Sequence, residues 1–287
     1  RSYGAYILEG SPFSFFNRTM YRLVRLRLID PSKVIGVSHV AYKWITPSMT
    51  ATFIKPVVPY LKAFVVHDEK ERDMLTGIAP GANCIIVRPG VQAPPDEPGH
   101  VASCTRFELL FLSAPMIGAT AEEAFQNKGI AMLLESFSRF AARHDACLTL
   151  VWRNRFYEEL CREIAVRGLT GSVEVINHQV DTAALYRRTA AVVFPAAALE
   201  GSTHYPMSVM ESLSYGRPVV VSDVVAIAGI VKKHGCGTIF SPAASDLSNA
   251  LIDLYEHYDA YRARALDTFR ECFDYEKNIQ PLRELLA

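Results

Sequence analysis

The chain has 287 residues, half of them hydrophobic, which is enough to bury one large core or two of ordinary size. Basic and acidic residues number 30 each, so no net charge attracts nucleic acid or another polyanion, and we expect no nucleic-acid partner. The six cysteines stand in apolar or helical contexts, without C-x-x-C and without zinc-ligand spacing to a histidine, which indicates buried thiols in a reducing cytosol.

No apolar run approaches the roughly 20 residues that span a bilayer, and no signal-peptide pattern opens the chain. We therefore expect a cytoplasmic protein, either fully soluble or peripheral at the inner membrane face. The chain begins at Arg1 and enters a strand-like stretch within a few residues. From this start we expect that upstream sequence is missing or has been removed.

The first 95 residues alternate short apolar runs with helical stretches, as is typical of a parallel α/β domain. The strand-like runs are residues 5–8, 34–37, 63–66 and 84–87. Within residues 15–28, Arg18, Arg22, Arg25 and Arg27 stand among large apolar residues, which predicts a basic amphipathic helix. Such a helix has the composition that lies on an anionic membrane surface, and an ordinary surface helix with solvated arginines is the alternative.

Residues 88–99 hold four prolines and two glycines, which neither a helix nor a strand tolerates, so an interdomain linker is predicted there. Beyond it the alternation resumes. The predicted strands are 109–112, 148–152, 173–176, 191–194, 218–222 and 238–240, and the predicted helices are 129–144, 157–167, 182–189 and 207–214. Strands joined by covering helices imply right-handed crossovers and a doubly wound, Rossmann-like sheet. The tail from residue 246 to the end is predicted to be largely helical, with Pro281 interrupting its last stretch.

One loop of the second domain carries the strongest functional signal. In a doubly wound sheet, ligands bind at the carboxyl ends of the strands, where helix N-termini point free N–H groups at the crevice. The polar loop after the 191–194 strand ends at Pro206, which suits the first turn of a helix containing Ser208 and Val209. Glu211 follows in the second turn, where a carboxylate can accept two hydrogen bonds from a vicinal diol such as ribose. A solvated helix glutamate is the alternative.

The stretch from Pro206 to Asp223, PMSVMESLSYGRPVVVSD, resembles the signature of the retaining family-4 glycosyltransferases, which have two Rossmann-like domains (the GT-B architecture). Weaker similarity covers residues 126–129, 185–186 and 235–242. The resemblance implies a glycosyltransferase that moves a sugar, with retention, from a nucleoside-diphosphate-sugar donor to the hydroxyl of a glycan, a lipid-linked or a small-molecule acceptor. It also implies no cofactor and no metal ion, and no cluster of Asp, His and Glu has metal-site spacing.

The resemblance divides the chain into three parts. Residues 1–95 would form a short or truncated acceptor-side domain, and residues 104–270 would form the donor-binding domain. Residues 271–287 would form a C-terminal helix that returns to the first domain.

The resemblance also implies residue roles. Glu211 would bind the donor ribose, and Lys128 would neutralise the diphosphate as charge develops on it. The family's second glutamate stands eight positions before the first; here that position is Thr203, and Glu200 takes the role if the loop carries a three-residue insertion. Lys128 and Glu200 are the catalytic candidates. Residues 173–180 correspond to the base-contacting strand and loop, which includes His178.

The family's phosphate-binding arginine is absent after the first strand of this domain, where residues 111–115 read FLSAP. Arg153 or Arg155 would supply the charge, unless both are solvated loop arginines. Two other functions stay open: a catalytically silent donor-binding subunit, and a sugar-nucleotide epimerase on the same scaffold. No glycine run matches a Walker loop or a G-x-G-x-x-G fingerprint, which disfavours a nucleotide triphosphatase and a dehydrogenase.

Overall fold

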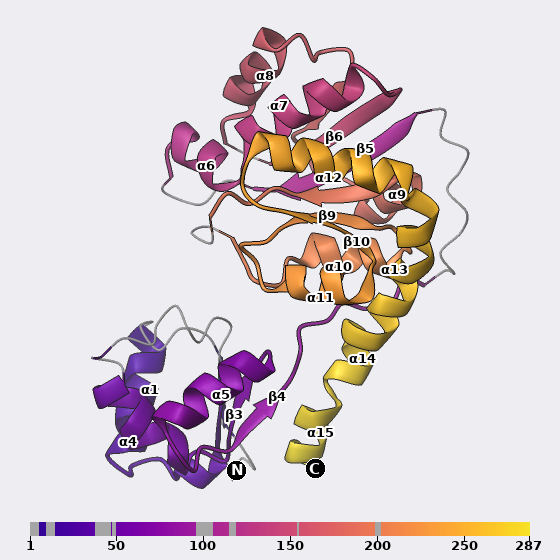
Figure 1. Cartoon of the computed structure of the whole chain (residues 1–287). Coiled ribbons are helices and arrows are strands. Elements are labelled where there is room, and N and C mark those ends of the chain that lie inside the picture. Colours follow the sequence, from indigo (N-terminus) through magenta and orange to yellow (C-terminus); the bar gives the residue numbers. More distant parts are fainter. Residues whose placement is uncertain are drawn as a thin grey trace. The chain divides into compact units, whose positions relative to one another are not determined.

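The computed structural model describes residues 6–9, 15–37, 47, 50–95, 106–114, 119–153, 155–198 and 202–287. The chain forms two compact units (Figure 1). Unit 1 comprises Arg1–Gly90 together with Tyr275–Ala287, and unit 2 comprises Val91–Asp274. Each unit contains a parallel sheet, so the predicted architecture of two Rossmann-like α/β domains with a short first domain is confirmed.

Unit 1 is built on a four-stranded parallel sheet in the order β1-β2-β3-β4. The strands are β1 (Tyr6–Glu9), β2 (Val34–Val37), β3 (Ala63–Val66) and β4 (Cys84–Ile86). The helical segments are α1 (Phe15–Arg25), η1 (Pro31–Lys33), η2 (Thr50–Ile54), α4 (Lys55–Val57), η3 (Val58–Tyr60), α5 (Glu69–Ile78), α14 (Tyr275–Asn278) and α15 (Gln280–Leu286). Apolar side chains of α1, η2, α5 and β3 share one buried cluster that forms the core of the unit.

Helix α1 confirms the predicted amphipathic helix but ends earlier than residue 28. Its apolar side chains Tyr21 and Val24 are buried, and the Tyr21 ring lies 4.2 Å from that of Phe53. The helix stops because Arg27 has a positive φ of 59°, and its guanidinium lies 4.5 Å above the ring of Tyr60. The apolar face of α1 is therefore used by the core of unit 1.

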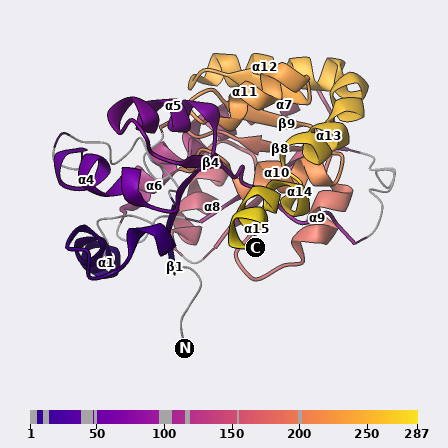
Figure 2. The same ribbon diagram turned by 90° about the horizontal axis from the view of Figure 1, so that it is seen from below.

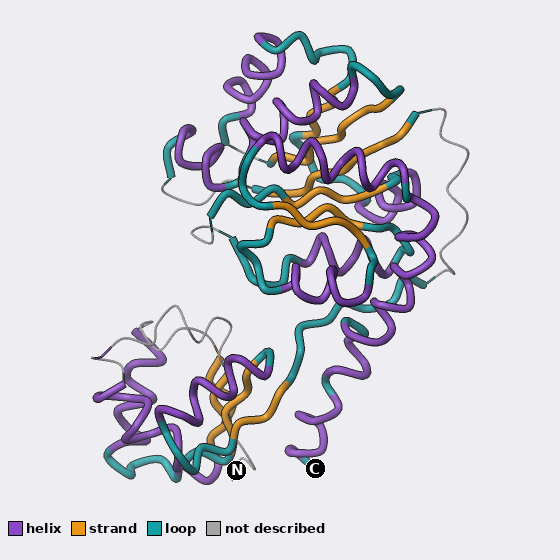
Figure 3. Tube along the Cα trace, viewed as in Figure 1, coloured by secondary structure: helices purple, strands orange, loops and turns teal. Residues whose placement is uncertain are grey.

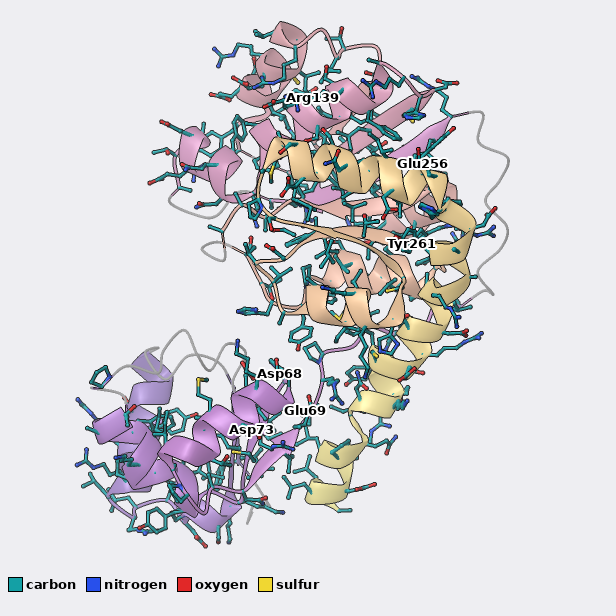
Figure 4. All side chains as sticks on the ribbon, viewed as in Figure 1. Asp68, Glu69, Asp73, Arg139, Glu256 and Tyr261 are labelled. Atoms are coloured by element: carbon teal, nitrogen blue, oxygen red, sulfur yellow. The ribbon has the colours of Figure 1, made fainter. Side chains whose placement is uncertain are left out.

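The carboxyl end of β3 leads directly into α5. Asp68 is the N-cap of α5, and its carboxylate accepts a hydrogen bond from the backbone N–H of Glu71 at 2.8 Å. Glu71 is buried, and its carboxylate accepts from the backbone N–H of His67 at 2.9 Å. Figure 4 shows Asp68 and Glu69 at the start of α5 and Asp73 further along it. These bonds fix the turn between strand and helix.

Unit 2 has a six-stranded parallel sheet in the order β10-β9-β8-β5-β6-β7, which is the doubly wound Rossmann order. The strands are β5 (Phe107–Ser113), β6 (Ala146–Trp152), β7 (Val173–Ile176), β8 (Ala191–Phe194), β9 (Val219–Ser222) and β10 (Gly237–Phe240). The helices are α6 (Ala121–Asn127), α7 (Ile130–Ala141), α8 (Tyr157–Val166), α9 (Thr182–Arg188), α10 (Met207–Ser214), α11 (Ile227–His234), α12 (Ala244–Glu256) and α13 (Tyr258–Cys272). Figure 3 shows the strands as an inner layer with helices outside it.

Helices cover both faces of this sheet (Figure 1 and Figure 2). Apolar residues of α7, α8 and α12 pack against one face in one buried cluster. Those of α9, α10, α11 and α13 pack against the other face in a second cluster. Successive strand residues alternate between the two clusters, as Leu109 and Leu110 do, because side chains alternate across a strand. A sheet buried on both faces explains why its strands are continuous apolar runs.

The structure corrects several predicted boundaries. Helices α6 and α11 lie in stretches where no helix was predicted, and α7 ends at Ala141 rather than at residue 144. The predicted interruption of the helical tail is found directly before Pro281, where α14 ends at Asn278 and α15 begins at Gln280. Pro281 thus stands in the first turn of α15, where a proline costs no hydrogen bond. Within the described ranges, no helix combines the length and the apolar composition that crossing a bilayer requires.

Candidate functional site

The topology of unit 2 predicts a ligand-binding crevice at the carboxyl ends of β5 and β8. These two strands are neighbours in the sheet. From β5 the next strands, β6 and β7, are added toward one edge of the sheet, whereas from β8 the next strands, β9 and β10, are added toward the other edge. Ligands of doubly wound sheets bind where the strand order reverses in this way. The segment after β5 reaches Lys128 through α6, and the segment after β8 leads to α10. The structure thus brings these two candidate regions to the same edge of the sheet.

A close backbone contact joins the two regions. Gly129 has a φ of 68° and is the N-cap of α7; a Cβ at this position would lie 1.7 Å from the carbonyl oxygen of Pro195. The backbone N–H of Ala197 also donates to the carbonyl oxygen of Asn127 at 3.2 Å. Only glycine permits this approach, so Lys128 is held against the loop that leads to α10.

Lys128 is the C-cap residue of α6 and is half-buried. Burial lowers the pKa of its ammonium group, because partial loss of hydration disfavours the charged form. An anion beside such a group restores part of the lost stabilisation of its charge. The role of Lys128 toward a diphosphate stays a prediction.

Glu211 lies on α10 and is half-buried. The buried hydroxyl of Tyr186, from α9, donates a hydrogen bond of 2.6 Å to Oε2 of Glu211. Burial, together with the nearby charge of Glu211, raises the pKa of Tyr186, so its hydroxyl stays protonated and acts as the donor. From the sequence, Tyr186 belonged only to a stretch of weak family similarity and had no assigned role. Its contact with Glu211 could not be predicted, because the sequence does not show that α9 and α10 lie side by side.

The start of α10 is a helix N-terminus without a side-chain cap. Pro206 is its N-cap, and the carbonyl oxygen of Pro206 accepts from the N–H groups of Val209 and Met210. The half-buried Ser208 lies in the first turn, whereas the Val209 side chain is fully buried in the core. Since the Val209 N–H already donates to Pro206, neither the side chain nor the backbone donor of Val209 is available to a ligand.

The loop before α10 is fixed by His204, which the sequence analysis did not single out. Its Nδ1 accepts a hydrogen bond from the N–H of Ala226 at 3.2 Å, and its carbonyl oxygen accepts from the N–H of Ile227 at 3.1 Å. Burial lowers the pKa of His204 to about 4, so the ring is neutral at neutral pH. Thr203, one residue earlier, is exposed, and its hydroxyl accepts from the N–H of Tyr205 at 3.4 Å.

Of the remaining candidates, Arg153, Arg155 and His178 follow strands at the same edge of the sheet. Glu200 lies outside the described residues. Arg153 is exposed at the end of β6, next to β5 in the sheet, while Arg155 stacks on the ring of Phe156 with 4.6 Å between its guanidinium carbon and the ring centre. His178 is exposed after β7, the edge strand, which β6 separates from β5. Arg153 is therefore better placed than Arg155 to supply a charge near the crevice.

Comparisons with known proteins agree with this architecture. The family described as "Glycosyl transferases group 1" matches residues 114–257. No curated protein sequence gives a significant match to the chain.

Several solved structures share the fold. A glycosyltransferase from Rickettsia africae ESF-5 has a TM-score of 0.71 at 12% identity, over 97% of this chain and 83% of its own. HepE from Anabaena, solved with UDP, has a TM-score of 0.70 at 14% identity, over 88% and 71%. Sucrose-phosphate synthase from Thermosynechococcus elongatus has a TM-score of 0.65 at 15% identity, over 88% and 66%.

The family match covers half of the sequence and includes most of unit 2, with α6, α10 and the strands between them. It therefore spans the crevice that the topology marks as the ligand-binding edge. This chain belongs to the glycosyl transferases group 1 family and is a glycosyltransferase.

Proposed function

We propose that the chain is a family-4 glycosyltransferase that moves a sugar from a nucleoside diphosphate to an acceptor hydroxyl with retention of configuration. The observation that carries this proposal is the hydrogen bond from Tyr186 of α9 to Glu211 of α10, the helix that begins at the crevice edge. A half-buried carboxylate fixed by a buried donor is pre-organised to receive a diol, because its second oxygen keeps its position when ribose arrives.

The donor would be held by groups that follow β5 and by groups that follow β8, the two strands between which the strand order reverses. Glu211 binds the ribose, and Lys128 meets the diphosphate, where negative charge develops as the bond from the sugar C1 to the phosphate oxygen breaks. The backbone N–H of Ser208, in the first turn of α10, is offered to the same anion, whereas that of Val209 already donates to Pro206. Arg153 adds a second cation, and backbone groups near His178 read the base. No metal ion is needed in this arrangement.

Glu200 and Thr203 are the candidates for contact with the donor sugar. Thr203 stands eight residues before Glu211, and Glu200 stands three residues further back. We assign the role to Glu200, since a carboxylate makes stronger hydrogen bonds to sugar hydroxyls than a neutral hydroxyl does. Glu200→Gln should then lower kcat far more than Thr203→Val does.

The donor class to test first is a UDP-sugar, because the Anabaena relative was solved with UDP, with UDP and glucose, and with UDP-glucose. The acceptor is a glycan, a lipid-linked sugar or a small molecule. In the assay, the full chain is incubated with the donor and a panel of acceptors, and nucleoside diphosphate and the anomeric protons of the product are followed by NMR. Diphosphate release that requires an acceptor, with an unchanged anomeric configuration, supports the proposal.

The same assay separates the two alternative functions. A silent donor-binding subunit would bind the nucleotide sugar but release no diphosphate with any acceptor. An epimerase would convert the donor sugar into its isomer without an acceptor.

The end of α1 supports a lipid-linked acceptor. Leu26 and Leu28 directly follow α1, and they are 67% and 71% exposed. Arg22 and Arg25 are also exposed on the last turn of the helix. Apolar side chains beside basic ones are the combination that binds an anionic membrane surface. We therefore propose that this turn, rather than the buried apolar face of α1, contacts the membrane.

A further inference from the structure

A group of potential metal ligands lies away from the crevice. His234 is the last residue of α11, and Glu271 and Cys272 end α13. One donor atom from each of the three residues lies within 4.8 Å of the other two. Because α11 ends just before β10 begins, the group lies at the amino edge of the sheet, opposite the proposed donor site. Sequence spacing did not reveal it, since 38 positions separate His234 from Cys272.

We propose that His234, Glu271 and Cys272 bind a zinc ion. Imidazole, thiolate and carboxylate are the three ligand types that zinc takes in proteins, and thiolate disfavours calcium and magnesium. The Sγ atom of Cys272 lies 3.6 Å from Nε2 of His234. Two ligands on a tetrahedral zinc, with Zn–S of about 2.3 Å and Zn–N of about 2.0 Å, stand about 3.5 Å apart. These two donors therefore already have the separation that a shared zinc ion requires.

The third ligand is adjustable. The carboxylate of Glu271 lies 3.7 Å from Nδ1 of His234, the ring nitrogen that a zinc ion on Nε2 leaves unused. To reach the ion it must rotate toward Cys272, which costs little packing because its side chain is 64% exposed. The His234 side chain is only 15% exposed, which keeps the imidazole in place. On binding, the Cys272 thiol releases its proton to solvent and becomes a thiolate, and a water molecule completes the tetrahedron.

The helix termini distinguish a metal site from a reactive thiol. Helices α11 and α13 both end at this group, so the negative ends of two helix dipoles converge on it. A cation is stabilised there, whereas the reactive cysteines of enzymes typically occur at helix N-termini. Lys232 and Lys233 precede His234, but residues one and two positions apart project from different faces of a helix.

The site lies beside the place where the chain passes between its two units. The carbonyl oxygen of Phe273 accepts from the N–H of Val91 at 2.9 Å, and Val91 forms a parallel bridge with Asp274. The boundaries between the units fall directly after Gly90 and Asp274. A zinc ion that joins α11 to the end of α13 would therefore stabilise the segment of unit 2 in which Val91 pairs with Phe273 and Asp274.

The test is a calorimetric titration of the full chain with zinc chloride, repeated for Cys272→Ser, His234→Gln and Glu271→Gln. Cys161→Ser is the matched control, because Cys161 lies on α8, away from this group. We expect one zinc ion per chain and a rise of the melting temperature with zinc concentration. The first two variants should bind zinc more than about tenfold more weakly, with a smaller loss for Glu271→Gln. Cobalt should show the charge-transfer absorption of thiolate coordination, and Cys272→Ser should abolish it.

Circular dichroism without metal shows whether each variant folds, so that loss of the site is separated from loss of structure. Zinc binding that is unchanged in Cys272→Ser would overturn the proposal, as would no binding by the wild-type chain. A third contrary result is fast alkylation of Cys272 by iodoacetamide that zinc does not slow, which would identify a reactive thiol instead. None of these measurements depends on glycosyl transfer. The zinc proposal can therefore be refuted without refuting the proposed function, and the reverse also holds.

Discussion

The hydroxyl of Tyr186 donates a 2.6 Å hydrogen bond to the carboxylate of Glu211, and this bond ties α9 to the candidate ribose ligand on α10. Tyr186→Phe removes the donor but keeps the ring, which stacks on Tyr215 at 5.3 Å. We expect the chain to stay folded and to lose about 1 kcal/mol of nucleotide affinity, roughly fivefold, by calorimetry. Full affinity in Tyr186→Phe would mean that Glu211 needs no orientation by α9.

Lys128→Met tests the charge at the end of α6. Methionine keeps the length of the side chain but cannot neutralise a diphosphate. We expect UDP to lose at least about tenfold in affinity, while uridine binds almost as before, since only the diphosphate meets the ammonium group. Arg139→Met, which removes an exposed arginine of α7, is the control and should leave both ligands unaffected. Equal losses for UDP and uridine would show that Lys128 has a structural role.

Gly129→Ala tests the close contact between the Lys128 segment and Pro195. Gly168 is the matched control: both glycines have a φ of 68°, but a Cβ at Gly168 meets nothing within 4 Å. Both alanine variants lose stability because alanine disfavours the left-handed backbone, whereas only Gly129→Ala also displaces Pro195. We expect Gly129→Ala to lower the free energy of unfolding by about 1–3 kcal/mol more than Gly168→Ala, measured by urea denaturation. Equal losses would contradict the contact.

His204 predicts a specific pH dependence. Its pKa falls from 6.5 in the unfolded chain to about 4 in the folded one. Between these values the unfolded chain binds more protons, so the free energy of unfolding decreases as the pH is lowered from 6.5 toward 4. His204→Gln should flatten this part of the profile, measured by urea denaturation at several pH values. An unchanged slope in His204→Gln would show that this histidine does not set the pH dependence.

Much of the fold could be predicted from the sequence because unit 2 is regular. Its buried strands are apolar runs, and Pro206, Gly216 and Gly235 mark helix and loop boundaries, so the sheet and α10 were placed within a few residues. Helix α6 was missed although Thr120 and Glu123 form a capping box, since seven residues give little periodic signal.

The site was less accessible to sequence reasoning. Lys128 and Glu211 were found because they belong to local motifs. The partners of those motifs, namely Tyr186, His204 and Pro195, were not assigned, because each contact joins segments that are far apart in the sequence. The grouping of His234 with Cys272 arises in the same way, from two helices that end at one place.

The turn after α1 makes the membrane proposal testable. Arg22→Gln with Arg25→Gln removes two exposed charges and keeps helix propensity. Each arginine near an anionic surface contributes about 1 kcal/mol, so sedimentation with acidic vesicles at low salt should drop sharply, and added salt should weaken the wild-type binding. Arg139→Gln with Arg162→Gln, at exposed arginines of unit 2, is the control for charge number. Equal binding of the wild-type chain to neutral and acidic vesicles would rule the surface out.

The most direct test of the donor site is calorimetric titration of the wild-type chain and of Glu211→Ala with UDP-, GDP- and ADP-sugars. We expect one nucleotide sugar to bind the wild-type chain at a single site. Glu211→Ala should weaken that binding by about 1.5–3 kcal/mol, because it removes charge-assisted hydrogen bonds to the ribose. Undiminished affinity in Glu211→Ala, in a variant that circular dichroism shows to be folded, would contradict the assignment of this crevice as the donor site.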